Sequence, residues 1–279
     1  MHRLDRKKEL DFQKIHMPKF LRPKNICLDN GLEIYTMEGG AQELCRLDLV
    51  FEAGSKFQSK KLQAAICNAL LLEGTALIQG EEIHKRLDFY GAYTQLDVNS
   101  DRALVSLYTL NKYFHKVLPI FIDAIQNAIF PKEAFEIVLQ QKKHSFIINS
   151  EKVAFKARNA FFGSLFKNHP YGDSATLDDF DHITQDDIID FHNKHYKNAA
   201  FKIYIAGMLP VNLQELLNKY LGAWSIKNKA EPGQYHALVK NEKIHISKEG
   251  ALQSAIRIGR VCFNSSHKDY HKLKFLSVV

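Results

Sequence analysis

The densest group of chemically versatile side chains lies between residues 178 and 195, where six aspartates and three histidines occur. Carboxylates and imidazoles bind zinc and harder divalent cations, so this segment is a candidate metal site. However, the helix dipole favours acidic residues near the start of any helix and histidines near its end. We therefore expect a solvated helix here. The side chains concerned are Asp178, Asp179, Asp181, His182, Asp186, Asp187, Asp190, His192 and His195.

Other patterns that carry chemistry are incomplete. Ser164 stands in FFGSLF, which lacks the second glycine of a nucleophile elbow, and Gly39-Gly40 is not followed by the GK[ST] of a phosphate loop. The cysteines occur singly, without a CxxC pair, which favours small buried thiols in a reducing compartment over disulfides or metal ligands. They are Cys27, Cys45, Cys67 and Cys262.

Composition narrows the class of partner. The formal net charge of +7 comes from 38 basic and 31 acidic residues, and the basic runs are not interleaved with the aromatic residues of single-strand nucleic-acid binders. We therefore expect no nucleic-acid partner. The sequence contains neither a secretory signal nor an apolar run of about 18 residues, so we expect no membrane insertion and a cytoplasmic location.

The first half of the chain predicts two strands, two helices and two more strands. Apolar and polar residues alternate over 44–51, which is typical of a half-buried antiparallel strand. Spacings of three and four predict the helices, and glycines end both of them. The expected elements are a strand after the Asp29-Asn30-Gly31 turn, a strand over 44–51, helices over 59–73 and 81–91, and strands over 92–98 and 103–110.

The second half is mainly helical. We expect a helix over 112–130, and a helical region over 132–166 that divides near Asn149-Ser150, with Ser150 as a cap. Thr184 and Asp187 form a near capping box. We then expect a strand over 199–207, a helix over 210–222 and a strand over 254–263. The predicted organisation is a polar segment 1–24, an α+β domain 25–225, a linker 226–235, and the start of a second, truncated α+β domain over 236–279.

Several short motifs occur in the order found in the pitrilysin/insulinase family of zinc peptidases, the inverzincins, which this sequence resembles from about residue 25 to its end. The motifs are LDNGL at 28–32, AGS at 53–55, GT at 74–75, FYGA at 89–92, HPYG at 169–172, DHIT with FHNKHY at 181–196, YIAG at 204–207 and QSAIRIGR at 253–260. The resemblance implies an α+β fold of processing-peptidase type: a mixed, largely antiparallel sheet of five or six strands with helices packed on one face, followed by a similar domain.

The catalytic motif of that family is missing here. Active relatives carry HxxEH between AGS and GT, where two histidines one helical turn apart bind zinc and the glutamate activates a water molecule. In this sequence the histidines correspond to Ala65 and Ala69, and the glutamate corresponds to Asn68. A methyl group has no lone pair for zinc, and an amide is not a base at neutral pH. We expect Asn68 to form an ordinary buried hydrogen bond instead.

The remaining zinc ligand of the family, a glutamate, corresponds to a position between 144 and 146, where His144, Ser145 and Phe146 stand. One histidine supplies one of the three protein ligands of a catalytic zinc. We therefore expect no cofactor in this chain, in contrast to the zinc of active relatives.

A peptide-binding strand is the other property that the resemblance implies. Active relatives bind substrate as an added strand along a sheet edge, after the second helix, through main-chain hydrogen bonds. The corresponding residues here are Gln95 and Leu96. A plain sheet strand is the alternative for this segment.

These observations indicate a non-catalytic subunit of the pitrilysin/insulinase family. We expect it to bind peptide or unfolded polypeptide and to pair as a heterodimer with an HxxEH-containing relative, or to self-associate. Two alternatives stay open: a scaffold protein without peptide binding, and a zinc peptidase with an atypical metal site that involves His144 or the cluster of aspartates and histidines between 181 and 195.

Overall fold

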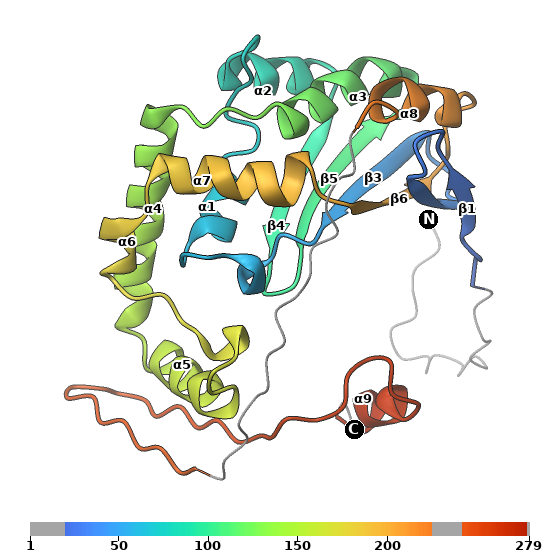
Figure 1. The fold of residues 1–279 in the computed structure, drawn as a ribbon. Coiled ribbons are helices and arrows are strands. Elements are labelled where there is room, and N and C mark those ends of the chain that lie inside the picture. The colour runs from blue at the N-terminus through green and yellow to red at the C-terminus, as the bar shows by residue number, and fades with distance from the viewer. Residues whose placement is uncertain (1–19, 225–241, 278–279) are drawn as a thin grey trace, which may run out of the picture.

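The computed structural model describes residues 20–224 and 242–277 (Figure 1). It contains one six-stranded sheet in the order β1-β2-β6-β3-β5-β4, in which β2 and β6 are parallel and all other neighbours are antiparallel. The expected mixed, largely antiparallel sheet is therefore confirmed. The strands are β1 (Lys24–Cys27), β2 (Glu33–Glu38), β3 (Leu44–Phe51), β4 (Tyr93–Val98), β5 (Ala103–Leu110) and β6 (Phe201–Gly207).

Helices make up most of the remainder of the described chain. Residues 242–262 run along α5, where the Lys248 ammonium pairs with the Glu151 carboxylate at 2.9 Å. The α-helices are α1 (Gln63–Ala69), α2 (Gly80–Phe89), α3 (Asn111–Gln126), α4 (Lys132–Ser150), α5 (Val153–Leu165), α6 (Asp179–His182), α7 (Gln185–His192), α8 (Leu213–Leu221) and α9 (Tyr270–Leu276). The short 3-10 helices η1 (Ser55–Phe57) and η2 (Pro170–Gly172) and the π-helical turn η3 (Asn193–Lys197) complete them.

The alternation of residues in strand β3 explains why one face of the sheet is buried and apolar, here called the dry face, and the other is polar. Cys45, Leu47, Leu49 and Phe51 have no exposed surface, whereas the intervening residues, such as Asp48, are partly exposed. Successive side chains of a strand point to opposite faces, so this alternation directs four apolar side chains into the core. Full burial of a large apolar side chain contributes about 1.5–3 kcal/mol, so this row stabilises the sheet against the helices that cover it.

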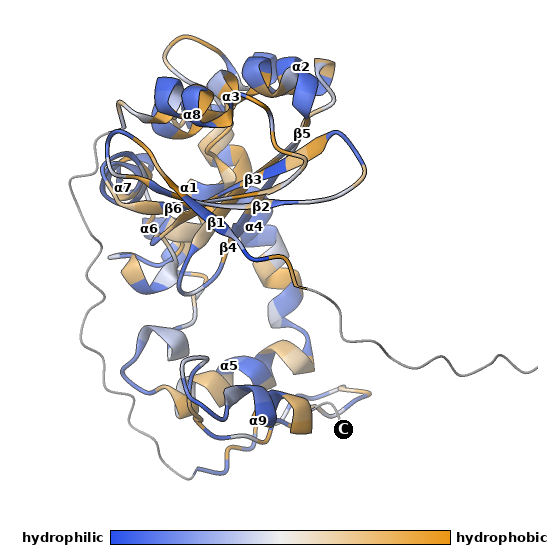
Figure 2. Ribbon diagram, turned by 90° about the vertical axis from the view of Figure 1, so that its right-hand side faces the viewer, coloured by the Kyte–Doolittle hydropathy of each residue, from blue (hydrophilic) through white to orange (hydrophobic). Residues whose placement is uncertain are grey.

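Amphipathic helices cover the dry face. The apolar stripe of α3 contains Phe114, Val117, Phe121 and Ile125, all of which have no exposed surface. In Figure 2, α2, α3 and α8 lie on the same side of the sheet, and their apolar residues turn inward. Because side chains three and four apart share one face of a helix, the sequence spacing specifies which side of α3 meets the sheet.

The predicted helix over 59–73 is shorter in the structure, where α1 contains only Gln63–Ala69. Leu62 has φ +75°, which a helix cannot contain, so the chain turns sharply at this residue. The Gln63 amide oxygen accepts the backbone N–H groups of Ser59 and Lys60 at 2.9 Å each. These donors are satisfied without a longer helix. Gly74 has φ +148° and lies in an isolated bridge, five residues beyond Ala69, the last helical residue.

The division between α4 and α5 falls where the sequence predicted it, but Ser150 is not the cap. Lys152 precedes α5, and the Ser150 hydroxyl donates to the Ile147 carbonyl at 2.7 Å. The capping box of α7 is confirmed, with Thr184 as its first residue.

Two further expectations differ from the structure. Residues 254–263 form no strand, because a strand requires a hydrogen-bonded neighbour and no described segment pairs with them. Cys45 and Cys67 are buried thiols, as expected, whereas Cys27 and Cys262 are exposed. The predicted linker 226–235 lies outside the described residues. None of the described helices is long and apolar enough to cross a membrane.

Candidate functional site

Helix α1 places Ala65 and Ala69 four residues apart, the spacing of the two zinc-binding histidines in an HxxEH motif, but neither residue can bind a metal. The helix lies between α7 and the strand β4, as Figure 1 shows. Ala65 and Ala69 are both half-buried, while Ile66 and Cys67 between them have no exposed surface. Residues four apart lie above one another on a helix, so the two alanines share the side of α1 that reaches solvent. That side presents two methyl groups, which cannot bind a metal.

Asn68 is a buried residue that forms a hydrogen bond within the core. Its side chain is 2% exposed, and its amide nitrogen donates to the hydroxyl of Tyr196, in η3, at 3.4 Å. Burial raises the pKa of Tyr196 well above its ordinary value. The Tyr196 ring also packs against Phe51 of β3 at 4.8 Å between centroids. The buried hydrogen bond expected for Asn68 is therefore present, and it connects α1 to η3.

The described residues do not fit a catalytic zinc. Ala65, Asn68 and Ala69 offer no ligand, and His144 is an exposed residue of α4. Within 20–224 and 242–277, no three side chains among His, Cys, Asp and Glu are grouped closely enough to bind a metal ion.

The histidines near the end of α7 are core residues. His192 is 2% exposed and its Nε2 atom lies 2.7 Å from the Ile125 carbonyl oxygen. His195 is 5% exposed and packs against Phe191 at 4.6 Å between ring centroids. Burial lowers the pKa of each imidazole to about 4. Both rings are therefore neutral at pH 7.

The aspartates of the same segment cap helices and pair with lysines. Asp187 accepts from Thr184 in the capping box and pairs with Lys60 at 2.8 Å. Asp181 pairs with Lys143 at 2.5 Å. This is the structural role that the helix dipole predicts. The group of residues from 178 to 195 is dispersed over α6, α7 and η3 and is not a site.

Strand β4 carries the two candidate peptide-binding residues, and it is an edge strand of the sheet. The Asn99 N–H donates to the Arg102 carbonyl at 2.9 Å, so Asn99 faces β5. Main-chain groups alternate in an antiparallel pair, which directs those of Thr94, Leu96 and Val98 away from β5. Outside the sheet, no hydrogen bond between described residues reaches these outward groups. Leu96 packs against the core, whereas the Gln95 amide donates to the Asp97 carboxylate at 2.6 Å.

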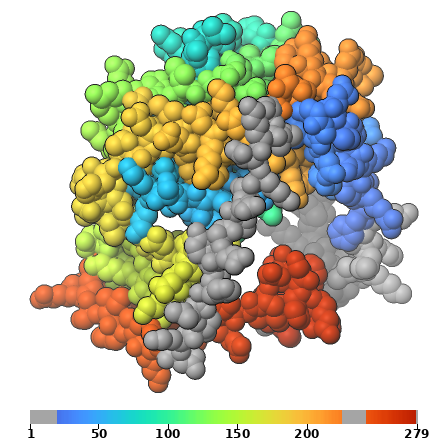
Figure 3. All heavy atoms as spheres, viewed as in Figure 1, coloured from blue at the N-terminus to red at the C-terminus, as the bar shows by residue number. Residues whose placement is uncertain are grey.

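A polar cavity of about 470 Å³ lies beside this edge, between residues 55–61 and the segment 163–173. Figure 3 shows these two stretches adjoining on one face of the molecule. Three lysines line the cavity, namely Lys56, Lys61 and Lys167. Sequence reasoning missed them because only the HPYG motif marks this region, and the lysines come from segments about 100 residues apart.

Comparisons with known proteins found similar sequences among peptidases. Residues 182–279 match the sequence profile described as Peptidase M16 inactive domain. An uncharacterized zinc protease of Rickettsia felis is 24% identical over 191 residues, which are 64% of this chain and 45% of that protein. Mitochondrial-processing peptidase subunit alpha-1 of Dictyostelium discoideum is 22% identical over 216 residues, 74% of this chain and 32% of that protein. This chain thus spans about half the length of the zinc protease.

Solved structures share the fold. A peptidase M16 inactive domain from Pseudomonas fluorescens superimposes with a TM-score of 0.71 and 21% identity, over 77% of this chain and 54% of that one. Pitrilysin superimposes with a TM-score of 0.68 and 17% identity, over 80% of this chain and 25% of that one.

The hydrogen bond between Asn68 and Tyr196 predicts coupled effects on stability. In N68L, the Tyr196 hydroxyl loses its partner, which we expect to lower the free energy of unfolding by about 1–3 kcal/mol. In N68L/Y196F both polar groups are gone, so the double variant should lose less than the sum of N68L and Y196F. Urea denaturation measures all three. Strict additivity would show that the two side chains do not interact.

The two buried histidines predict a loss of stability in mild acid. Their pKa values are lowered in the folded state, so the unfolded chain takes up protons first as the pH falls. Stability is complete above pH 6.5 and decreases as the pH falls from about 6.5 to about 4. The loss approaches about 3 kcal/mol per histidine at 1.36 kcal/mol per pKa unit.

Urea denaturation between pH 7 and pH 4.5 measures this effect. H192Q should flatten the pH dependence, because glutamine does not titrate and its amide can still donate to the Ile125 carbonyl. The control is H84Q, at an exposed position of α2, which should retain the parent slope. An unchanged slope in H192Q would contradict the prediction.

Proposed function

We propose that this chain, whose motifs resemble the M16 peptidase family, is a non-catalytic member of that family, a subunit that binds peptides and pairs with an HxxEH-containing relative. The observation that carries the proposal is the combination of an open edge at β4 with a neighbouring helix that has methyl groups at both histidine positions. Binding of an extended peptide requires only the open edge of β4, whereas hydrolysis of that peptide requires zinc ligands and a base, which α1 lacks.

The edge supports peptide binding on physical grounds. A strand with free N–H and C=O groups adds an extended peptide through main-chain hydrogen bonds, which tolerate many side chains. Thr94, Leu96 and Val98 present these groups. The side chain of Leu96 is half-buried and packs against the core, so the residue offers its main chain to the edge.

The polar face of the sheet supports a role as a chamber wall. Tyr35 and Tyr204 stack there at 5.3 Å between ring centroids. Arg46 pairs with Asp48 at 2.7 Å and lies over the Tyr108 ring at 5.0 Å. Tyrosine and arginine are enriched where proteins bind other chains. A partner with a similar sheet would enclose a peptide between two such faces.

The absence of zinc ligands and of a general base in α1 is the reason to propose a catalytic partner chain. An enclosed peptide is hydrolysed only if another chain supplies the zinc ligands and the base, since the residues at positions 65, 68 and 69 supply neither. One of the relatives described above is, by its name, a subunit of a processing peptidase. We extend this organisation to the present chain as part of the proposal.

Reconstitution tests the pairing. We expect a complex purified after co-expression with an HxxEH-containing relative to cleave peptides in a chelator-sensitive manner, while this chain alone does not. Replacing the motif glutamate of the relative by glutamine should abolish cleavage. H144A in this chain should leave cleavage unchanged, because His144 is exposed and stands alone.

Two results would favour the alternatives. Stoichiometric zinc together with chelator-sensitive cleavage by this chain alone would indicate an atypical metal site. Binding of a relative without any peptide affinity would indicate a scaffold.

Strand addition at β4 predicts a specific effect of L96P. Proline removes the outward N–H of Leu96, and its ring obstructs an incoming strand. The matched control is L96A, which loses the leucine side chain and keeps the N–H. We expect peptide affinity about tenfold weaker in L96P than in L96A, consistent with one lost hydrogen bond and an obstructed edge.

Fluorescence anisotropy with a labelled, extended peptide measures these affinities, and circular dichroism verifies that both variants are folded. Equal affinity of the two folded variants would show that peptides bind elsewhere or not at all.

A further inference from the structure

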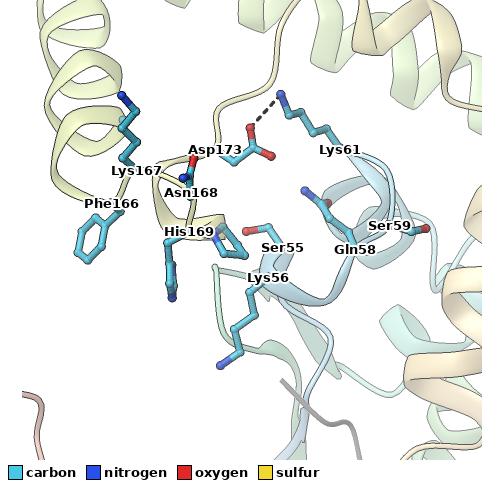
Figure 4. A pocket seen from close by; sticks show the side chains of 13 residues that line it. Ser55, Lys56, Gln58, Ser59, Lys61, Phe166, Lys167, Asn168, His169 and Asp173 are labelled. Carbon is cyan, nitrogen blue, oxygen red and sulfur yellow. Dashed lines mark ion pairs between the residues drawn. The ribbon is translucent and has the colours of Figure 1, made fainter. Parts of the chain in front are cut away.

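The cavity beside β4 has the size of a ligand-binding pocket and a mainly polar lining. Its volume of about 470 Å³ falls within the roughly 300–1,000 Å³ typical of ligand pockets. Figure 4 shows Ser55, Gln58 and Lys61 on one side and Lys167, Asn168 and His169 on the other. Hydroxyl, amide and ammonium donors predominate in its lining, so it suits a ligand rich in acceptor oxygens.

The cavity continues the edge of β4. The Ser55 N–H donates to the Asn99 carbonyl at 3.1 Å, and the Lys56 N–H donates to the Ser100 carbonyl at 3.0 Å. Gly54 makes this close approach possible, because a Cβ atom there would lie 2.4 Å from the Asp101 carbonyl carbon. The wall of the cavity formed by Ser55 and Lys56 is therefore hydrogen-bonded to the turn that follows Val98.

The charges inside the cavity are incompletely neutralised. Lys61 pairs with Asp173 at 2.9 Å across the cavity. Lys56 turns away from it and pairs with Asp101 at 2.7 Å. Lys167 is exposed, and no carboxylate in the described part of the chain lies within ion-pair distance of it. In Figure 4 the Lys167 side chain extends beside the end of α5 and not toward Lys61, so its ammonium group stands at the margin of the cavity, where an incoming anion can reach it.

We propose that this cavity binds a carboxylate of a peptide held along β4, with Lys167 as the principal contact. The proposal rests on the proposed function, because a peptide added to β4 reaches the cavity once it extends past Val98. An acidic side chain and a free C-terminal carboxylate present the same chemistry. The compact ammonium group of a lysine accepts either of them without a fixed geometry.

Peptide binding to the full-length protein tests the proposal. Labelled peptides with alternating threonine and valine carry glutamate or glutamine near each end, and each is made with a free or an amidated C-terminus. We expect the acidic peptide to bind about three- to fivefold more tightly, the effect of one partly exposed ion pair. A preference for glutamate indicates a side-chain carboxylate, and a preference for the free C-terminus indicates the terminal one. The advantage should shrink as the salt concentration rises.

Three variants complete the test. K167Q should remove the advantage of the acidic peptide, and K167E should favour a peptide with lysine in place of glutamate. The control K132Q, at a 78% exposed lysine side chain of α4 outside the cavity, should behave like the parent. Because Lys167 is exposed and unpaired among the described residues, these variants should fold normally.

The outcomes separate the two proposals. Equal binding of acidic and neutral peptides, with no effect of K167Q, would overturn the carboxylate pocket and leave peptide binding at β4 intact. Failure of every peptide to bind the parent protein, alone and in complex with an HxxEH-containing relative, would overturn both.

Discussion

The one-sided burial of β3 is the constraint on which the rest of the structure depends. Its four core-facing side chains have no exposed surface, and the strand lies between β6 and β5 near the centre of the sheet. Helices such as α3 cover that face and exclude water from it. The opposite face keeps its arginine, aspartate and tyrosines, and β4 is left at the edge with outward main-chain groups. Both features relevant to binding, the polar face and the open edge, are therefore consequences of the way the core is buried.

The position of Asn68 shows how the helix remains stable without a metal. A buried amide costs free energy unless it is hydrogen-bonded, and the hydroxyl of Tyr196 supplies the partner. Tyr196 in turn packs on Phe51, and Phe51 packs on Phe201 at 4.9 Å between ring centroids. Through these contacts α1 is attached to β3 and β6. Residues that would perform chemistry in an HxxEH helix are replaced here by small side chains at the surface and by one polar side chain that contributes to the core.

Sequence reasoning predicted the elements whose signals are local. The alternation in β3, the capping box of α7 and the break between α4 and α5 depend on residues within a few positions of one another. The missed features depend on distant partners. Strand β1 exists because it pairs with β2, and α1 is shortened because the Gln63 amide replaces helical hydrogen bonds. At the candidate site, the AGS and GT motifs on either side identified positions 65, 68 and 69 as those of the HxxEH residues, so their substitution could be predicted from the sequence. The lysine-lined cavity was not, since the fold alone brings Lys61 and Lys167 to opposite sides of it.

In this proposal the edge of β4 supplies general affinity for peptides, and the cavity supplies a preference for peptides that carry a carboxylate. Hydrogen bonds from the main chain of β4 are the same for almost every peptide sequence, so they supply affinity without discrimination. A single available ammonium group at the end of the edge adds a small, salt-sensitive preference. Because this preference is only a few-fold, a partner could still receive many different peptides. A non-catalytic subunit of this kind would bias which peptides are retained, while the rate of cleavage would be set by the chain that holds the metal.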